Sequence, residues 1–362
     1  MEKYFILICR IIFVLALFVL ICGKFKTIGH FFIYKEESKV SYPGDLYVMC
    51  KINQFKEDTP IKEYSETSEV SNCAIITLGD SFFTTTRDSY ILASELENSL
   101  EKVDIYNVSI EDAQKCNYNP LKFLENINFK KSCEKKILIL ESAERYSLER
   151  ALSYYPTQHR KNDKFKIDFF KKTKSRFFNH DDVDYFFKEN ILTYHINKYL
   201  KNLKFDYFHE IDRRIGAFSL MPSMLFYFEE IDFNKKNITT DEIECASKNL
   251  KRMAVMLKND YNVDLVYLII PNKYSVYNDY INKVNNYNKY INKINNSLKQ
   301  NNVNVVDVFS RYLQYRKKDD SKLIYYRSDT HYTAFGKHLL IDEIINFISS
   351  NNLMKVKPRS ND

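Results

Sequence analysis

A serine and an acid–histidine pair are the residues of this chain whose types and spacing suit nucleophilic chemistry. Ser81 closes a Gly-Asp-Ser turn that follows the strand-prone segment 73–78 and precedes a helical pattern. Near the other end of the chain, Asp329 and His331 are two residues apart, so in an extended segment their side chains project to the same side. A serine nucleophile needs a histidine base, which in turn needs an orienting carboxylate. We therefore predict Ser81 as nucleophile, His331 as base and Asp329 as the acid that orients it.

Each motif taken alone also fits a simpler interpretation. Many Gly-Asp-Ser tripeptides are only turns, and an Asp-x-His ahead of a helix is compatible with a surface acid and a structural histidine. Their context favours chemistry, because both motifs lie at strand-to-helix junctions of an α/β pattern. Open α/β sheets bind their ligands at the carboxyl ends of the strands.

The elements that position these motifs alternate from residue 73 onward. The segment 263–270 is almost continuously apolar, which is typical of a strand buried in a parallel sheet. A helix is expected from Ser81 to about Leu100, and a closing helix over 335–348 with Thr333 as its cap. The expected strands are 73–78, 103–108, 136–140, 263–270 and 303–308, with a possible short strand at 45–51.

Four blocks of the sequence resemble the SGNH hydrolase-like family, in particular the branch that contains the alginate O-acetyltransferases. The blocks are 79–82, 140–146, 271–277 and 329–332 followed by Gly336. The resemblance implies a three-layer α/β fold with a central, mostly parallel sheet. In the alginate enzymes the Asp-x-His block precedes the serine, whereas here it follows Ser81, so an alginate substrate is not implied.

The chain departs from the family where the oxyanion donors are expected. SGNH hydrolases use a glycine after the second strand and an asparagine after the third, but here the two exits read Asn107-Val108-Ser109 and Glu144-Arg145. Asn107 and Arg145 are the candidates to replace those donors. A turn asparagine and a structural Glu–Arg pair explain them equally well. Lys273 and Tyr277 follow the strand at 263–270 and are further candidates for binding substrate.

Residues 1–25 predict an uncleaved transmembrane anchor. The run 11–22 is uninterrupted by polar residues, and the apolar segment 4–22 contains only Arg10 as a charge, close to the length of about 20 residues that a spanning helix needs. A cleaved signal peptide is the alternative, but no small-x-small cleavage site follows Cys22. We expect a single pass through the bacterial cytoplasmic membrane, with the catalytic domain outside, in the periplasm or extracellular.

Composition shifts divide the rest of the chain. We expect a tether at 26–70, a catalytic domain at 71–350 with a helical insertion at about 150–235, and a tail at 351–362. Within the insertion, the stretch 159–178 mixes lysine and arginine with phenylalanine, which suits an anionic membrane, a glycan or single-stranded nucleic acid, or merely a solvated helix with a buried aromatic stripe. The net charge of +7 is too small to imply nucleic acid, and no such partner is expected.

The cysteines give no sign of a metal site. Two of the seven lie in the N-terminal apolar segment, and none of the others forms a CxxC or Cys/His cluster. Cys116 and Cys133 flank a short helical stretch and could bridge, although spacing alone does not establish a disulfide. We expect neither a metal nor another cofactor.

Together, these features predict a membrane-anchored O-acyltransferase, most simply an O-acetyltransferase, that modifies a cell-surface or exported polysaccharide through an acyl-serine. By analogy with related systems, a multi-spanning membrane acyltransferase passes on the acetyl group. An SGNH-type carbohydrate or lipid esterase would use the same three residues with water as acceptor. A catalytically impaired glycan-binding scaffold of a polysaccharide assembly system is the other alternative, motivated by the departures at the oxyanion positions.

Overall fold

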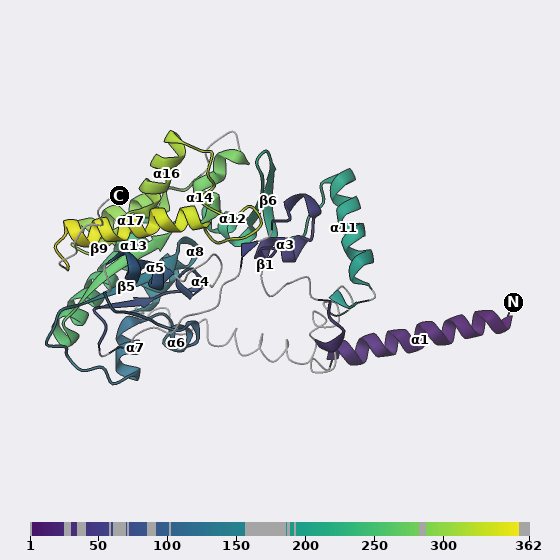
Figure 1. The fold of residues 1–362 in the computed structure, drawn as a ribbon, viewed down its shortest axis with the longest axis horizontal. Helices are drawn as coiled ribbons and strands as arrows, with labels where there is room; N and C mark the ends of the chain where they lie inside the picture. The colour runs from purple at the N-terminus through teal and green to yellow at the C-terminus, as the bar shows by residue number, and fades with distance from the viewer. Residues whose placement is uncertain are drawn as a thin grey trace. The chain divides into compact units, whose positions relative to one another are not determined.

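The computed structural model divides into two compact units, which are treated separately below (Figure 1). The first unit consists of Met1–Glu37, Cys50–Asn53 and Pro156–Ile211, and the second of Ser38–Met49, Gln54–Tyr155 and Asp212–Asp362. The structure describes residues 2–24, 30–34, 41–57, 59–60, 70, 72–84, 92–100, 103–155, 186, 189–191, 193–281 and 287–354.

A five-stranded sheet forms the centre of the second unit, and every pairing in it is parallel. Its order is β4-β3-β5-β8-β9, so the first of these strands in the chain lies inside the sheet. From β3 the chain adds β4 on one side and β5, β8 and β9 on the other. The topological switch point therefore lies between β3 and β5, and open α/β sheets bind their ligands at such a point. The strands are β3 Ile75–Leu78, β4 Ile105–Asn107, β5 Lys136–Ala143, β8 Val263–Ile270 and β9 Asn304–Val306.

Helices cover this sheet in two layers. Helix α5 (Leu92–Ser99) packs with α17 (Ala334–Ser350), which also contacts α16 (Val308–Lys318) (Figure 1). Helix α13 (Thr240–Met256) packs with α8 (Glu144–Ser153) and α15 (Tyr290–Gln300). Because parallel crossovers are right-handed, the two groups lie on opposite faces of the sheet. The α/β fold with a mostly parallel central sheet is thus confirmed. Further helices of the unit include α4 Ser81–Thr84, α6 Ile110–Lys115, α7 Pro120–Asn126, α12 Phe228–Lys235 and α14 Lys273–Tyr277.

Two smaller pairs of strands complete the second unit. An antiparallel hairpin joins β6 (Ile215–Leu220) to β7 (Ser223–Tyr227), within the region predicted as a helical insertion. A short antiparallel pair joins β1 (Ser41–Tyr42) to β2 (Thr59–Pro60). The basic and aromatic stretch 159–178 lies outside the described residues, as does 85–91 of the helix expected after Ser81.

The segment predicted as an anchor is helical, as α1 (Glu2–Lys24) of the first unit. Among the described residues, no helix combines the length and the apolar character that crossing a membrane requires. The predicted transmembrane segment is therefore not confirmed. The first unit also contains α11 (Tyr194–Phe208) and an ion pair between Lys51 and Glu189.

The short strand predicted at 45–51 is wrong: residues 45–50 form the helix α3 (Asp45–Cys50). Leu46 and Tyr47 are fully buried, and both of their backbone N–H groups donate to the carbonyl oxygen of Ser328, at 3.0 and 3.1 Å. Gly44 makes this approach possible. It has φ +88°, and a Cβ there would lie 2.4 Å from the same oxygen. The region expected to be a tether thus includes a helix packed against the acid–histidine segment.

The cysteines remain thiols. Cys116 is buried, Cys133 is exposed, and both are free, so the bridge considered from their spacing is not formed. At the C-terminal end, Thr333 caps α17 as predicted, and its side-chain oxygen accepts from the backbone N–H of Gly336.

Candidate active site

The turn that presents Ser81 is built at the carboxyl end of β3. Gly79 lies against Glu141 of the neighbouring strand β5, and a Cβ at Gly79 would approach the Glu141 Oε2 to 2.3 Å. That oxygen accepts the backbone N–H of Asp80 at 2.7 Å. Burial and the neighbouring Asp80 carboxylate raise the pKa of Glu141 well above its ordinary value. A strand side chain thus fixes the turn, and Ser81 begins α4 directly above it.

The three residues predicted from the sequence come together across 250 positions of the chain. The Nε2 of His331 lies 2.8 Å from the Oγ of Ser81, and its Nδ1 lies 2.6 Å from the Oδ1 of Asp329. Asp329 is fully buried and His331 is 9% exposed. In this arrangement Nδ1 carries the proton that it donates to the carboxylate, so Nε2 is left to accept the serine proton.

Aromatic packing locks the two halves of the site in register. The ring of Phe82 lies 4.8 Å from that of His331 and 5.4 Å from that of Tyr332. The hydroxyl of Tyr332 donates to the backbone oxygen of Phe82. Phe82, which follows Ser81, is therefore bonded to Tyr332, which follows His331. This bond keeps the imidazole close to Ser81.

Asp45 is a residue of the site that sequence reasoning missed. Its backbone N–H donates to the Oδ2 of Asp329 at 3.1 Å, the carboxylate oxygen that His331 does not use. Its own carboxylate accepts from both the backbone N–H of Thr330, at 2.9 Å, and the Thr330 hydroxyl, at 2.6 Å. Asp45 thus forms hydrogen bonds with Asp329 and Thr330, the two residues that precede His331. The sequence offered little to find it, because Asp45 follows Pro43 and Gly44, a combination typical of an ordinary turn.

We predict that Asp45→Ala slows acylation of Ser81 by about 10- to 100-fold, because a small displacement of the acid and base removes them from productive geometry. The rate of Ser81 acylation by an activated acetyl ester measures the effect. Asp307→Ala is a matched control, since Asp307 caps α16 through the Ser310 N–H and lies outside the site. Equal rates in the two variants would show that Asp45 has no positioning role.

Lys273 and Tyr277 follow β8 as predicted, in α14, but their surroundings do not suit the predicted role in binding substrate. Both are fully buried, so a substrate does not reach them. The ammonium of Lys273 donates to the carbonyl oxygens of Tyr326, Arg327 and Asp329 at 2.9, 3.2 and 2.7 Å. The hydroxyl of Tyr277 accepts the backbone N–H of Ile324 at 2.7 Å. These two residues therefore bind the backbone of residues 324–329, which lead into His331.

Burial lowers the pKa of Lys273 to about 8, against the opposing attraction of Glu230, Asp45 and Asp329. An ammonium in this position is costly to bury, and the three carbonyl oxygens it bridges compensate part of that cost. Its arrangement fits a structural clamp on the segment that carries the base.

Asn107 and Arg145 also have protein partners. The amide oxygen of Asn107 accepts from the Thr77 hydroxyl at 2.7 Å, and its Nδ2 donates to the Phe83 carbonyl at 3.4 Å, so Asn107 supports α4. Arg145 lies 3.8 Å from both Glu229 and Glu230. Among the described residues, no contact joins Arg145 to Ser81 or His331. Their roles at the oxyanion remain predictions.

The backbone N–H of Ser81 is the oxyanion donor that the structure places best. In the part of the chain that the structure describes, it donates to no protein acceptor. It belongs to the predicted nucleophile itself, so it would lie next to a carbonyl group that Ser81 attacks. Preorganised donors of this kind are worth about 10²–10³ in rate each.

Asp45, Asp329 and His331 lie close enough together to surround a cation. However, the atoms that would ligate it are already bound. The Nδ1 of His331 is paired with Asp329, and the Asp45 carboxylate is paired with Thr330. The hydrogen-bonded set fits an acid–base relay better than a metal site.

Comparison with known proteins supports the resemblance inferred from the motifs. Residues 222–360 match the family model described as SGNH hydrolase-like domain, acetyltransferase AlgX. The match contains Asp329 and His331 but begins after Ser81, which lies outside it. No curated protein and no solved structure matches the chain. The family match supports an enzyme of the acyl-transfer or esterase type and confirms the predicted similarity to polysaccharide acetyltransferases.

Proposed function

We propose that this protein is an O-acetyltransferase that modifies a polysaccharide through an acetyl-Ser81 intermediate. The observation that carries the proposal is the continuous hydrogen-bonded path from the Ser81 Oγ through His331 to the buried Asp329, with distances of 2.8 and 2.6 Å. The family match over residues 222–360 supports acetyl as the acyl group. The resemblance of the four sequence blocks to alginate O-acetyltransferases supports a polysaccharide as the acceptor.

In the first half-reaction, the Ser81 Oγ attacks the carbonyl carbon of the acetyl donor while the Nε2 of His331 takes its proton. Asp329 stabilises the imidazolium, and the Ser81 N–H faces the oxyanion. The imidazolium then protonates the leaving group as its bond to the carbonyl breaks. In the second half-reaction, a sugar hydroxyl gives its proton to Nε2 and attacks the acetyl carbon, and the Ser81 Oγ leaves and recovers that proton.

The acceptor decides between transfer and hydrolysis. With water in place of the sugar hydroxyl, the same steps describe a carbohydrate or lipid esterase. We favour transfer because the family match is to an acetyltransferase. A multi-spanning membrane acyltransferase is the partner we propose to supply the acetyl group.

The test is mass analysis of the purified protein after brief exposure to an activated acetyl ester, followed by addition of an oligosaccharide. We expect an acetyl group on the peptide that contains Ser81, and its transfer to sugar faster than its loss to water. Loss to water at the same rate with and without sugar would identify an esterase. An unmodified Ser81 under all conditions would leave only a glycan-binding scaffold.

We also propose that the protein works outside the cytoplasm and that its N-terminal segment holds it at the membrane. The sequence run 11–22 is wholly apolar, and large side chains of α1 such as Phe5 and Phe13 are 68% and 69% exposed. Fractionation of cells that express the chain with and without residues 2–24 checks this proposal. Equal recovery of both forms in the soluble fraction would contradict it.

A further inference from the structure

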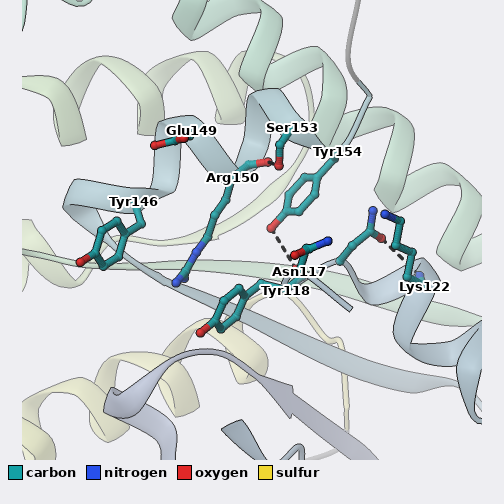
Figure 2. A pocket seen from close by; sticks show the side chains of 9 residues that line it. Asn117, Tyr118, Lys122, Tyr146, Glu149, Arg150, Ser153 and Tyr154 are labelled. Atoms are coloured by element: carbon teal, nitrogen blue, oxygen red, sulfur yellow. Dashed lines mark hydrogen bonds between the residues drawn. The ribbon is translucent and has the colours of Figure 1, made fainter. Parts of the chain in front are cut away.

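We propose that a pocket beside the nucleophile turn binds an anionic group, a carboxylate or a phosphate, carried by one of the substrates of the transferase. The pocket has a volume of about 590 Å³, within the usual range of small-ligand sites. The inference rests on the function proposed above and assigns a subsite to it. The lining residues whose chemistry matters here are Tyr118, Lys122, Tyr146, Glu149, Arg150 and Tyr154 (Figure 2).

Arg150 supplies the first group for an anion. A guanidinium has five N–H donors, and the two protein bonds of Arg150 both use Nη1. That nitrogen donates to the Asp80 Oδ2 at 3.3 Å and to the Ser142 Oγ at 3.0 Å. Over the described residues, Nε and Nη2 have no protein acceptor. An arginine with a free edge matches the planar geometry of a carboxylate or the oxygens of a phosphate.

Two tyrosines fix the plane of this guanidinium. The ring of Tyr118 lies 3.8 Å from the Arg150 Cζ and that of Tyr146 lies 5.3 Å from it, so Arg150 is held between them (Figure 2). Tyr118 adopts φ +55° and the preceding Asn117 φ +52°. Such left-handed backbone is uncommon for a bulky residue, and it turns the Tyr118 ring onto Arg150. The loop thus has a strained backbone conformation at the residue whose ring stacks on Arg150.

Lys122 supplies a second cation, from α7. Its side chain is exposed and has no hydrogen-bond acceptor among the residues that the structure describes. Other polar groups of the lining are already used. The Tyr146 hydroxyl donates to Glu229 at 2.6 Å, the Tyr154 hydroxyl donates to the Tyr118 carbonyl at 3.1 Å, and Glu149 is engaged elsewhere. Besides the amide of Asn117, the available groups include the outer edge of Arg150 and the ammonium of Lys122, and these two cations favour an anion over a neutral sugar.

The pocket is linked directly to the reaction site. Asp80, which accepts from Arg150, precedes Ser81 in the chain, and its Oδ1 accepts the Phe82 N–H at 3.3 Å. An anion bound on Arg150 therefore lies beside the turn that carries the nucleophile. It belongs either to an acidic sugar of the acceptor or to a phosphate-bearing acetyl donor, and in both cases it would orient the substrate.

The experiment measures ligand binding to the full chain by isothermal titration calorimetry at low salt. The probes are a glucuronate-containing oligosaccharide, inorganic phosphate and a neutral glucose oligosaccharide. The variant is Lys122→Glu, because its side chain is exposed and makes no hydrogen bond or ion pair with the residues that the structure describes. Lys293→Glu on α15 is the matched control, with the same charge change on a helix that packs with α13 and β9. We expect Lys122→Glu to weaken anion binding by about five-fold or more, because a charge at the rim becomes repulsive, and Lys293→Glu to leave it unchanged.

The probes separate the two sources of the anion. Stronger binding of the glucuronate oligosaccharide than of phosphate assigns the pocket to the acceptor, and the reverse assigns it to the donor. Equal binding of the neutral and acidic oligosaccharides, or equal loss in the Lys122 and Lys293 variants, would overturn the proposal.

Ser81→Ala keeps failure of this proposal apart from failure of the proposed function. That variant should bind the anion as the wild type does. Anion binding without any acetylation of Ser81 would leave the subsite and remove the transferase. Acetyl transfer through Ser81, together with anion binding that Lys122→Glu does not change, would keep the transferase and remove the subsite.

Discussion

Replacing Ser81 with alanine should abolish the acetylated peptide and lower turnover by about 10⁴- to 10⁶-fold, the range for losing the nucleophile of a catalytic triad. The Oγ of Ser81 forms the covalent bond in the proposed mechanism, and it lies 2.8 Å from the Nε2 of His331, the proposed base. The measurement combines mass analysis of the Ser81 peptide with release of the activated ester's leaving group.

The same variant should remain folded, because the hydroxyl of a partly exposed serine adds little to stability. Ser99→Ala on α5 is the matched control, since the Ser99 hydroxyl donates to the Glu95 carbonyl within its own helix. Comparable melting temperatures for the two variants establish that only chemistry has changed. Acetylation or turnover surviving in Ser81→Ala would assign the reaction to another residue and would refute the proposed mechanism.

Replacing Lys273 with methionine should destabilise the fold by about 2–4 kcal/mol and lower the rate of Ser81 acylation by about 10²-fold. Without the ammonium, the buried carbonyl oxygens of Tyr326 and Asp329 lose the Nζ donor that the structure gives them, and each such loss costs about 1–3 kcal/mol. The Arg327 oxygen is affected less, since it also accepts the Leu225 N–H at 2.9 Å. The released segment carries His331, so its displacement lowers the rate. Urea unfolding and acylation kinetics measure the two effects.

Lys136→Met is the control for burial of a lysine. Lys136 is 5% exposed and its ammonium donates to the Cys73 carbonyl, at the amino end of the sheet and away from the nucleophile. This variant should lose stability but keep the acylation rate of its folded fraction. If Lys273→Met and Lys136→Met acylate equally fast, the clamp on the acid–histidine segment is not needed for the reaction.

The pH dependence of stability gives the Lys273 prediction a second readout. The pKa of Lys273 is about 8 in the folded protein against an ordinary 10.5. Between these values the unfolded chain binds the proton that the folded chain has released, so stability rises with pH in that interval. The free energy of unfolding of the wild type should therefore gain on that of Lys273→Met from about pH 8 to about pH 10. A constant difference would show that Lys273 titrates normally.

Much of the local structure could be read from short patterns. The strand before Ser81 and the apolar strand Val263–Ile270 lie in the parallel sheet as expected. The cap of α17 by Thr333 was also predicted and is present. Such features depend on neighbouring residues, so a single sequence is enough to find them. The same local reasoning placed Asp329 and His331 on one side of an extended segment.

Interactions between distant residues were invisible to these patterns. The contact of Asp45 with Thr330 joins residues 285 positions apart, and the segment around Asp45 carries only the marks of a polar connection. Lys273 follows a strand at the edge where ligands bind, which made it resemble a binding residue. Its burial depends on the segment 326–329 folding over it, and no local pattern encodes that.

By itself, the sequence determined which residues of this protein are the candidates for acyl transfer, because a serine at a strand-to-helix turn and an Asp-x-His before a helix are local chemical patterns. Only the tertiary structure decided that these groups meet, with the Ser81 Oγ 2.8 Å from the His331 Nε2. The physical reason is that their distance depends on the parallel sheet, on α3 and on the buried ammonium of Lys273. Each of these acts through contacts between segments far apart in the chain.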